Sequence, residues 1–472
     1  GKFGITLNNA TIYYKSVSAT DNDYMAELVH QDVHGGSKMA DVQTALTTAG
    51  MGSYNTTVFD DIKKTNANSE NKSTDDFYNV FGNTGNITIR GEKAVFTHSY
   101  KHFDYTSNPH TTEANGIVFN DGKVLLAKRD DGKPETQHAV FLVSKDNVWN
   151  HDGVNNQYFY NDSKGSVTAE TDNTAMFLFL PRDNGGHRHI SVINKGTLKL
   201  TGNTTAGLFP NNGDLGIDLF LNFSDGKSAG NQLQLAHSES AHNSKYYNEI
   251  TGGITNRTTA ENSHPLIISG KSSAGLYLPN KNSVVTGQFA VDVQTPGGIT
   301  DGSAGIYAVD DVDLQGHYIK LSGSNNVGVY PAPYNGTSND ADIYLGAGSI
   351  RLEGGNNNTG IVVKDNYGNV YSESEMVLKG GNNNVAIYAS KHNSGSSAAV
   401  DYDVMVKSIE TDTDAMEDGV FVYTESGAKV KTDAAAGGLK IKGKISNGNP
   451  VYDGGTLSKN SGGVYAKSGS EV

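Results

Sequence analysis

Cysteine is absent from this chain of 472 residues. That absence excludes disulfide frameworks, thiolate zinc sites and thiol nucleophiles together. The chain also lacks any run of about 18 apolar residues, so no segment is expected to cross a membrane as a helix. No cleavable secretory signal is recognisable at its start. We therefore interpret the chain as a mature or excised piece of a longer protein.

A positively charged face is missing as well. The formal net charge is −14 and the pI is about 5.4, which argues against a nucleic-acid partner and against binding to anionic membranes. The apolar fraction is 36%, which is low for a globular domain and predicts a thin core. Aromatic residues still make up 9%, which disfavours a disordered chain.

Glycine, at 56 positions, and asparagine are abundant, and both tolerate positive φ in tight turns. One phrase recurs along the chain. It consists of alternating apolar residues, a glycine, a short Asn/Ser-rich gap, then Gly or Ala, an aliphatic residue and an aromatic residue. The clearest copies are Leu198–Phe209, Leu266–Tyr277 and Ile319–Tyr330. Looser copies cover Ile350–Val362 and Val377–Tyr388.

The second half of the phrase supplies the expected structural repeat glycines, which are Gly207, Gly275, Gly305, Gly328, Gly360, Gly419 and Gly463. More degenerate second halves are expected in the N-terminal part, at Gly116–Phe119, Ala139–Phe141 and Ala175–Phe177. Alternation with period two predicts short strands with one apolar face. Glycine and Asn-Asn-Asn predict corners, and the asparagines are expected to stack as ladders on successive rungs.

One such unit cannot bury its apolar face alone, whereas stacked units bury a continuous column. The predicted fold is therefore all-β, a right-handed parallel β-helix (solenoid) with loop and short helical insertions in the N-terminal half. About 17 rungs would give a rod roughly 80 Å long. Residues 1–190 are expected to form an irregular β-helix with inserted loops and short helices, and residues 191–472 regular β-helix repeats. One inserted helix is predicted through Val42 and Leu46, with Ser37 as its cap and Gly50 at its end.

The phrases at 323–330 and 380–389 resemble the passenger repeats of autotransporters. They are most similar to the very large fusobacterial outer-membrane adhesins of the type V secretion class, and the resemblance covers about 190–472. It implies a secreted passenger at the bacterial cell surface. It also implies a secretory signal before this stretch and, after it, an outer-membrane β-barrel that would be the only membrane anchor.

The resemblance further implies adhesion. Members of this family attach to other bacteria and to host cells, through galactose-type glycans on host cells or through protein receptors, including receptors on immune cells. No residue motif for either kind of ligand can be transferred to this chain. A structural spacer, with the binding tip elsewhere in the parent protein, is the alternative.

Candidate ligand-binding residues come from the chain itself. Trp149 and His151 stand close to Tyr158 and Tyr160, and aromatic rings with polar neighbours are what a carbohydrate site needs. The alternative is that these rings pack beneath their own loop.

The densest imidazole cluster, His187 and His189, is a second candidate. An exposed polar loop is its alternative interpretation, and a metal site is not predicted there.

Enzymatic activity is not expected, and neither is a cofactor. A polysaccharide-degrading β-helix would need carboxylates that converge on one cleft. The acidic groups lie at 310–313, 401–403 and 410–418, where solvated surface charge is the simplest interpretation. Calcium binding by one of these groups is an alternative that the sequence leaves open.

Overall fold

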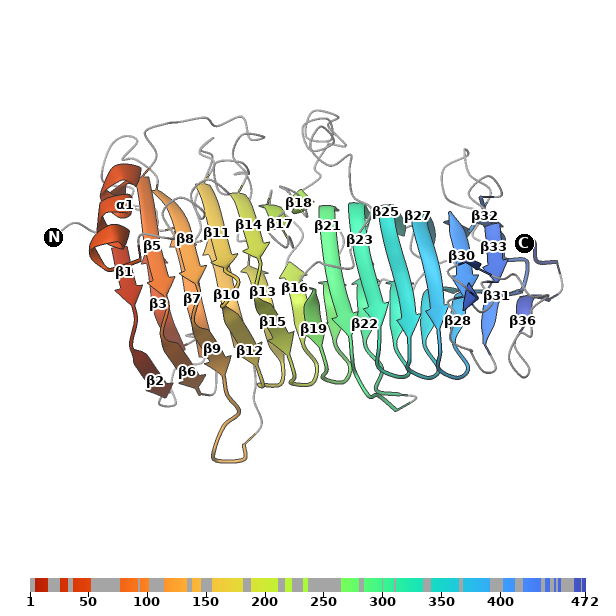
Figure 1. Cartoon of the computed structure of the whole chain (residues 1–472), viewed down its shortest axis with the longest axis horizontal. Coiled ribbons are helices and arrows are strands. Elements are labelled where there is room, and N and C mark those ends of the chain that lie inside the picture. Colours follow the sequence, from red (N-terminus) through yellow and green to blue (C-terminus); the bar gives the residue numbers. More distant parts are fainter. Residues whose placement is uncertain are drawn as a thin grey trace.

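The structure is a computed structural model. It describes residues 5–15, 26–32, 37–51, 77–91, 94–101, 114–133, 138–145, 155–180, 188–210, 217–222, 232–236, 265–279, 284–298, 300–309, 311–333, 341–364, 368–390, 402–411, 419–433, 438–441, 445–446, 449–450, 462–467 and 469–472. The chain forms an elongated rod of stacked parallel strands with its two termini at opposite ends (Figure 1). This confirms the prediction of an all-β parallel β-helix.

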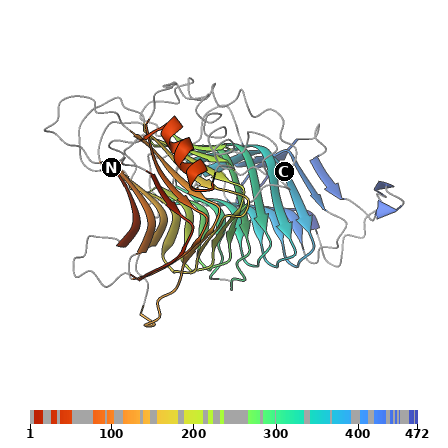
Figure 2. The same ribbon diagram turned by 60° about the vertical axis from the view of Figure 1, so that its left-hand side comes forward.

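Each rung has three sides, which we name faces A, B and C. In one rung, β14 (Arg188–Asn194) lies on face A, β15 (Thr197–Leu200) on face B and β16 (Ala206–Pro210) on face C. Each pairs in parallel with the equivalent strand of the rung before. Four long strands, β21 (Val284–Val293), β23 (Val312–Leu321), β25 (Ala341–Glu353) and β27 (Gly368–Lys379), each cover both A and B, so their rungs have two strands. Beyond β27 the two faces again have separate strands. Figure 2 shows the curved rungs stacked behind one another.

Faces A and B together make one 22-stranded sheet. Its parallel strands are β1 (Ile5–Asn8), β2 (Thr11–Lys15), β5 (Phe77–Asn83), β6 (Asn86–Arg90), β8 (Ala114–Asn120), β9 (Lys123–Leu126), β11 (Asn155–Asn161), β12 (Ser166–Ala169), β14, β15, β17 (Ile217–Asn222), β19 (Leu266–Ile268), β21 (Val284–Val293), β23 (Val312–Leu321), β25 (Ala341–Glu353), β27 (Gly368–Lys379), β29 (Val404–Val406), β30 (Ser408–Thr411), β32 (Val430–Thr432) and β33 (Gly438–Ile441). Two further members, β4 (Ser37–Lys38) and β18 (Gln232–Ala236), pair in the antiparallel sense.

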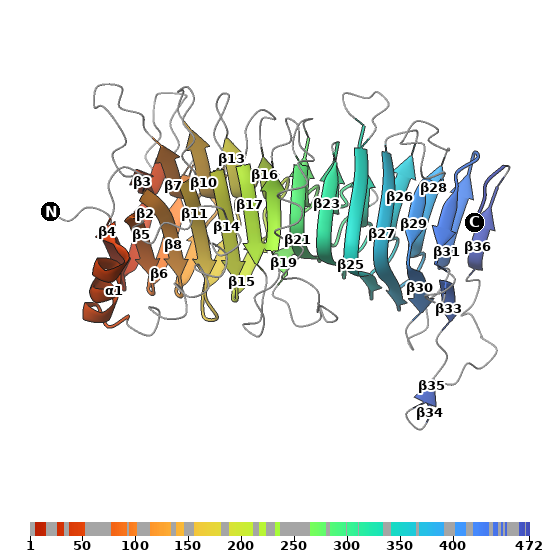
Figure 3. The same ribbon diagram turned by 90° about the horizontal axis from the view of Figure 1, so that it is seen from above.

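Face C is a 12-stranded sheet. Its strands are β3 (Ala26–Asp32), β7 (Ala94–Lys101), β10 (His138–Lys145), β13 (Thr174–Leu180), β16, β20 (Ala274–Leu278), β22 (Ala304–Ala308), β24 (Val327–Pro331), β26 (Thr359–Lys364), β28 (Val385–Ser390), β31 (Val420–Glu425) and β36 (Gly462–Ala466). A short hairpin, β34 (Ile445–Ser446) with β35 (Asn449–Pro450), stands off the C-terminal end of the rod (Figure 3).

The rung count is lower than expected from the sequence. Among the described residues face C contributes one strand to each rung, so its 12 strands define 12 rungs and a length of about 55 Å, compared with the expected 17 rungs. The phrase Gly116–Phe119, predicted as a second half, belongs to β8 on face A. Both kinds of strand are short apolar runs, which the sequence pattern alone does not distinguish.

The strands form because their apolar side chains alternate. In β23, Ile319 and Leu321 are completely buried, whereas Lys320 between them lies on the outer surface. Stacking places these inward residues in one continuous core that runs from Phe81 to Val430. A unit that would be unstable alone is stabilised by its neighbours on both sides.

In the predicted asparagine triplets, each of the three residues has a different structural role at the turn between faces B and C. In the triplet 356–358, Asn357 adopts a φ of +56°, which asparagine tolerates better than most residues. Asn358 is buried, accepts the backbone N–H of Asn326 at 2.9 Å, and donates to the Gly323 carbonyl at 2.8 Å. Asn356 stays exposed and accepts the N–H of Asn382 at 2.8 Å. The expected ladder is thus present at this turn.

The repeat glycines also stack. A Cβ built on Gly207, Gly275, Gly305 or Gly328 would lie 2.4–2.6 Å from the carbonyl oxygen of the glycine on the next rung. No side chain fits so close to a backbone oxygen, so these positions require glycine.

Gly419 does not belong to this column, which corrects the sequence interpretation. Register pairs Val385 with Val420 and Tyr388 with Tyr423, so Gly419 precedes the strand and Phe421 occupies the glycine position. The phrase Gly419–Phe421 resembles the repeat in composition but is shifted by two residues, because Tyr423 rather than Phe421 is the outward aromatic residue.

The predicted helix is present as α1 (Met39–Thr48). Ser37 does not cap it. Lys38 is the N-cap residue and makes no side-chain cap bond. The C-terminal end does follow the prediction, since Gly50 has a φ of +75° and its N–H reaches the Thr47 carbonyl at 3.1 Å. No helix among the described residues is long and apolar enough to cross a membrane.

Candidate functional site

The predicted ligand-binding residues fall into two groups. Trp149, His151 and His187 lie outside the described residues. His189 is on β14, where its backbone is in register with Asn156 and Asp218 on the neighbouring strands. The structure thus gives no grouping of these four side chains.

Tyr158 and Tyr160 do have a defined environment, and it is internal. Their exposed fractions are 1% and 0%. Both rings lie on the outer side of face A, where they share a buried cluster with Val42 and Leu46 of α1. The ammonium of Lys195 sits 5.2 Å from the centre of the Tyr160 ring. These two rings therefore pack inside the protein, which does not support direct contact with a ligand.

Outward-facing aromatic rings occur instead on face C. The fourth residue of the repeat strands forms what we name the tyrosine column, whose members are Phe209, Tyr277, Tyr307, Tyr330, Tyr388, Tyr423 and Tyr465. The ring centres of the first four are 5.1, 5.4 and 5.7 Å apart along the rod. The last three stack at 5.5 and 5.0 Å with nearly parallel planes. Val362 interrupts the column between the two groups.

Charged side chains flank the C-terminal part of the tyrosine column. The Tyr388 hydroxyl donates to Glu425 at 2.6 Å, and this bond lowers the pKa of the Glu425 carboxyl below its usual value. Lys467 stands 5.3 Å from the Tyr423 ring and 5.8 Å from the Tyr465 ring. In this C-terminal part the rings cover each other's faces, so it presents mainly ring edges, hydroxyls and these charges to the solvent.

A second aromatic pair lies on the outer side of face A. Tyr344 and Tyr371 are in register on β25 and β27, with ring centres 5.1 Å apart. Asp342 lies two residues before Tyr344, and its side chain is 3.4 Å from the Tyr344 hydroxyl. Asn369 and Asp311 contact Asp342 from the rungs on either side. We name these five residues the acidic tyrosine patch.

A buried serine–histidine pair sits where the long strands bend. His317 Nε2 is 2.5 Å from the hydroxyl of Ser374, which also contacts Ser372. The imidazole reaches two rungs along the rod because Gly348 stands between them, and a Cβ there would lie 2.7 Å from His317 Nδ1. His317 is 4% exposed and Ser374 is 0% exposed. The pair links two rungs at this bend and is buried away from solvent.

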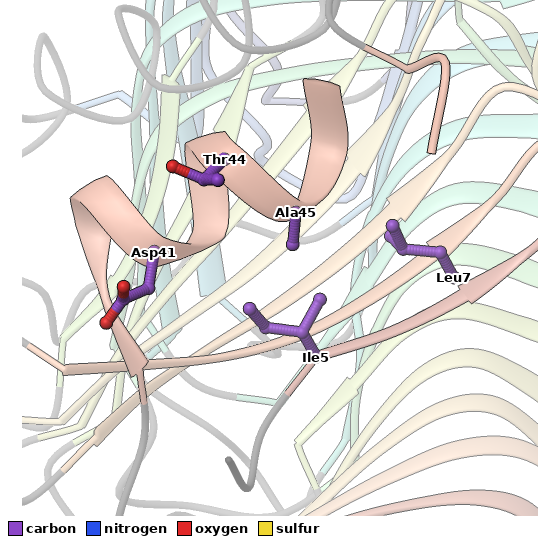
Figure 4. A pocket seen from close by; sticks show the side chains of 5 residues that line it. All are labelled: Ile5, Leu7, Asp41, Thr44 and Ala45. Atoms are coloured by element: carbon purple, nitrogen blue, oxygen red, sulfur yellow. The ribbon is translucent and has the colours of Figure 1, made fainter. Parts of the chain in front are cut away.

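A groove lies at the N-terminal end of the rod, between β1 and α1. It has a volume of about 450 Å³ and is lined by Ile5, Leu7, Asp41, Thr44 and Ala45 (Figure 4). Three of these five side chains are apolar, with the Asp41 carboxylate and the Thr44 hydroxyl on the helix side. Its size is that of a small-ligand site, but its polar groups come from the helix alone.

The acidic groups considered as carboxylate or calcium sites are only partly described. Asp310, Asp401 and residues 412–418 lie outside the described residues. Asp403 is completely buried and accepts the Lys429 N–H at 2.7 Å. Within the described ranges no group of three or more His, Asp or Glu side chains is placed to hold a metal ion.

Comparisons with known proteins give no relative. No family model matches the chain, and neither a curated protein nor a solved structure matches it.

Burial of the histidines predicts a pH-dependent stability. Burial lowers the pKa of His317 to about 3 and that of His138 to about 4, from an ordinary 6.5. Below pH 6.5 the two histidines bind protons in the unfolded chain but stay neutral in the folded chain. The free energy of unfolding therefore falls as the pH falls toward the lowered pKa values. For each histidine, the free energy of unfolding is expected to fall by about 2–3 kcal/mol between pH 7 and pH 4.5.

Urea unfolding at the two pH values measures this loss. The His317→Gln variant, whose amide can still bond Ser374, should lose less stability than the wild type over the same interval. Equal losses in both proteins would show that other groups govern the acid sensitivity.

Proposed function

We propose that this chain is a segment of a bacterial cell-surface adhesin, a rigid β-helical rod that attaches to host cells or to other bacteria. One observation supports this most directly. The interior of the rod is filled from end to end by a single apolar core, so its outer surface is what partners can contact. Regular rungs repeat outward-facing groups along that surface, which suits extended contact with another surface.

The partner classes follow from the resemblance of the repeat phrase to fusobacterial type V adhesins. They are galactose-type glycans of host cells, protein receptors that include those of immune cells, and the surfaces of other bacteria. In this proposal the segment is a secreted passenger at the outer membrane.

A structural spacer is the second candidate. The stacked glycines and asparagines support it, because they favour a stiff rod whatever lies at its tip. The exposed aromatic groups of faces A and C favour adhesion, since a pure spacer has no need of them. A polysaccharide-degrading enzyme is less well supported, because the groove between β1 and α1 carries a single carboxylate, that of Asp41, where such an enzyme needs two or three.

Binding of the purified chain to epithelial and lymphoid cells tests the proposal. We expect saturable binding, measured by flow cytometry with labelled protein. Abolition by free galactose or N-acetylgalactosamine would identify a glycan ligand, and insensitivity to both sugars would identify a protein receptor. Absence of binding to these cells and to other bacteria would overturn adhesion in favour of the spacer. Heat-unfolded protein is the control for non-specific attachment.

A further inference from the structure

The N-terminal part of the tyrosine column, from Phe209 to Tyr330, differs from the C-terminal part in the way its rings are arranged. Neighbouring ring planes are inclined to each other by 58°, 44° and 67° along its four residues. The planes of Tyr388, Tyr423 and Tyr465 are inclined by only 17° and 19°. Stacked rings hide each other's faces, whereas inclined rings leave part of each face uncovered. Aromatic faces are therefore more accessible in the N-terminal part.

The rings of this part point away from the core. Tyr277 is half-buried, whereas Leu276 and Leu278 on either side of it are 0% and 1% exposed. Tyr307 and Tyr330 occupy the equivalent place on β22 and β24. Because the strands stack in parallel, these three rings follow one another along the rod at 5.4 and 5.7 Å. The outer side of face C thus carries a row of aromatic groups with one ring on each rung.

The strands that carry this row are uncharged. No Asp, Glu, Lys, Arg or His is present in β16, β20, β22 or β24. By contrast, the strands of the C-terminal part include Lys364 and Glu425. A charged group that left water for this row would find no opposite charge on the four strands, which is unfavourable. The row therefore suits an uncharged ligand.

The hydroxyls of Tyr277 and Tyr307 add polar groups to the row. Within the described part of the chain neither hydroxyl takes part in a hydrogen bond, whereas the Tyr388 hydroxyl donates to Glu425. Burial raises the pKa of Tyr307, so its phenol stays protonated and can both donate and accept. Half-buried hydroxyls of this kind can bond to the hydroxyls of a ligand that lies on the rings.

We propose that the N-terminal part of the tyrosine column binds a neutral, extended, β-linked glycan that lies along the rod. Sugars stack their C–H faces on aromatic rings and form hydrogen bonds through their hydroxyls, which matches inclined rings that carry phenols. The residue repeat of such a glycan is close to the distance between the strands of a sheet, so successive sugars meet successive rings. An extended peptide advances only about 3.3 Å per residue and would not stay in step with the rings.

The inference deepens the proposed adhesion and rests on it, because it names the class of glycan that the adhesin recognises. Chitohexaose and cellohexaose are the extended probes. Maltohexaose is the control ligand, since its α-linkages form a helical chain from the same glucose units as cellohexaose. Binding to the full chain is measured by isothermal titration calorimetry, and we expect at least one extended hexamer to bind more tightly than maltohexaose.

Tyr307→Ala should weaken binding of the extended hexamer about tenfold, and Tyr307→Trp should restore most of the affinity, because a larger ring can still stack on a sugar. The rescue distinguishes a stacking role from a purely structural one. The matched control is Tyr423→Ala, which removes the same ring from the stacked part of the column and should change affinity less than about twofold.

Several outcomes would overturn the inference. They are the absence of binding by both extended hexamers, equal binding of maltohexaose, and equal losses in Tyr307→Ala and Tyr423→Ala. Sedimentation velocity tests the remaining alternative. A dimer of the wild type that Tyr307→Ala abolishes, without any binding of oligosaccharide, would mean that the column packs against a second copy of the chain.

Cell binding separates this inference from the proposed adhesion. If the wild type binds cells but neither extended hexamer, the inference fails and adhesion stands. If a hexamer binds through Tyr307 but the protein binds no cells, the glycan site stands and adhesion fails. Competition by the hexamer is measured separately on host cells and on other bacteria, and the surface on which it occurs identifies the source of the glycan.

Discussion

Replacement of Gly275 by valine is expected to lower the free energy of unfolding by about 3 kcal/mol or more. The first added atom, Cβ, would lie 2.6 Å from the Gly305 carbonyl oxygen and 2.9 Å from side-chain atoms of Phe289 and Val291. The oxygen belongs to the backbone of the next rung, so the clash is relieved only by separating two rungs. Urea unfolding followed by circular dichroism measures the loss, and hydrogen exchange should locate it at β20 and β22.

Gly463 is the matched control for this prediction. It occupies the same position of the repeat on β36, where the nearest atom to an added Cβ is a Phe421 carbon at 4.0 Å. Gly463→Val should therefore change the free energy of unfolding by less than about 0.5 kcal/mol. Similar destabilisation by both substitutions would mean that strand flexibility, and not the contact between rungs, explains the requirement for glycine.

Replacement of Asn161 by alanine is expected to lower the free energy of unfolding by about 2–4 kcal/mol. Asn161 is completely buried at the corner between faces A and B and is the fourth member of a ladder of five asparagines. Each donates its Nδ2–H to the Oδ1 of the next at 2.8 Å, in the order Asn8, Asn83, Asn120, Asn161 and Asn194. The substitution leaves the Asn120 donor and the Asn194 acceptor without this partner in a dry interior.

The control for the ladder is Asn203, an asparagine in an exposed turn that accepts the N–H of Lys271 at 3.0 Å. Water can replace the side chain there, so Asn203→Ala should cost less than about 1 kcal/mol. Thermal unfolding of both variants makes the comparison. If the two losses are alike, the ladder contributes nothing beyond an ordinary turn. A larger loss for Asn161→Asp than for Asn161→Ala would further support it, because aspartate cannot donate to Asn194.

Most of the repeat could be predicted because it depends on patterns among residues that are close in the sequence. Alternating residues such as Ile319, Lys320 and Leu321 fix which side of a strand is apolar, and the glycine of each phrase marks where two backbones approach. The asparagine ladder at the corner between faces A and B also has a local signal in the sequence. Asn83, Asn120 and Asn194 are each followed two positions later by glycine, in phrases that connect two strands.

The candidate site could be predicted less well, because it depends on which rungs become neighbours. Tyr158 and Tyr160 looked like a binding site in sequence, but α1, more than a hundred positions earlier in the chain, lies over them. Tyr344 and Tyr371 carry no local sign of their pairing, which arises only when β25 and β27 stack in register.

By itself, the sequence determined the fold class, the turn positions and most of the repeat glycines, because these follow from period-two alternation and from backbone conformations that only certain residues adopt. The tertiary structure alone decided the number of rungs, the shifted register at Gly419 and the residues that meet on each outer face. Those features depend on register between segments some 26 to 41 residues apart, as between Asn358 and Asn384 or between Asn120 and Asn161. No local pattern encodes that register, since insertions of unequal length separate one rung from the next.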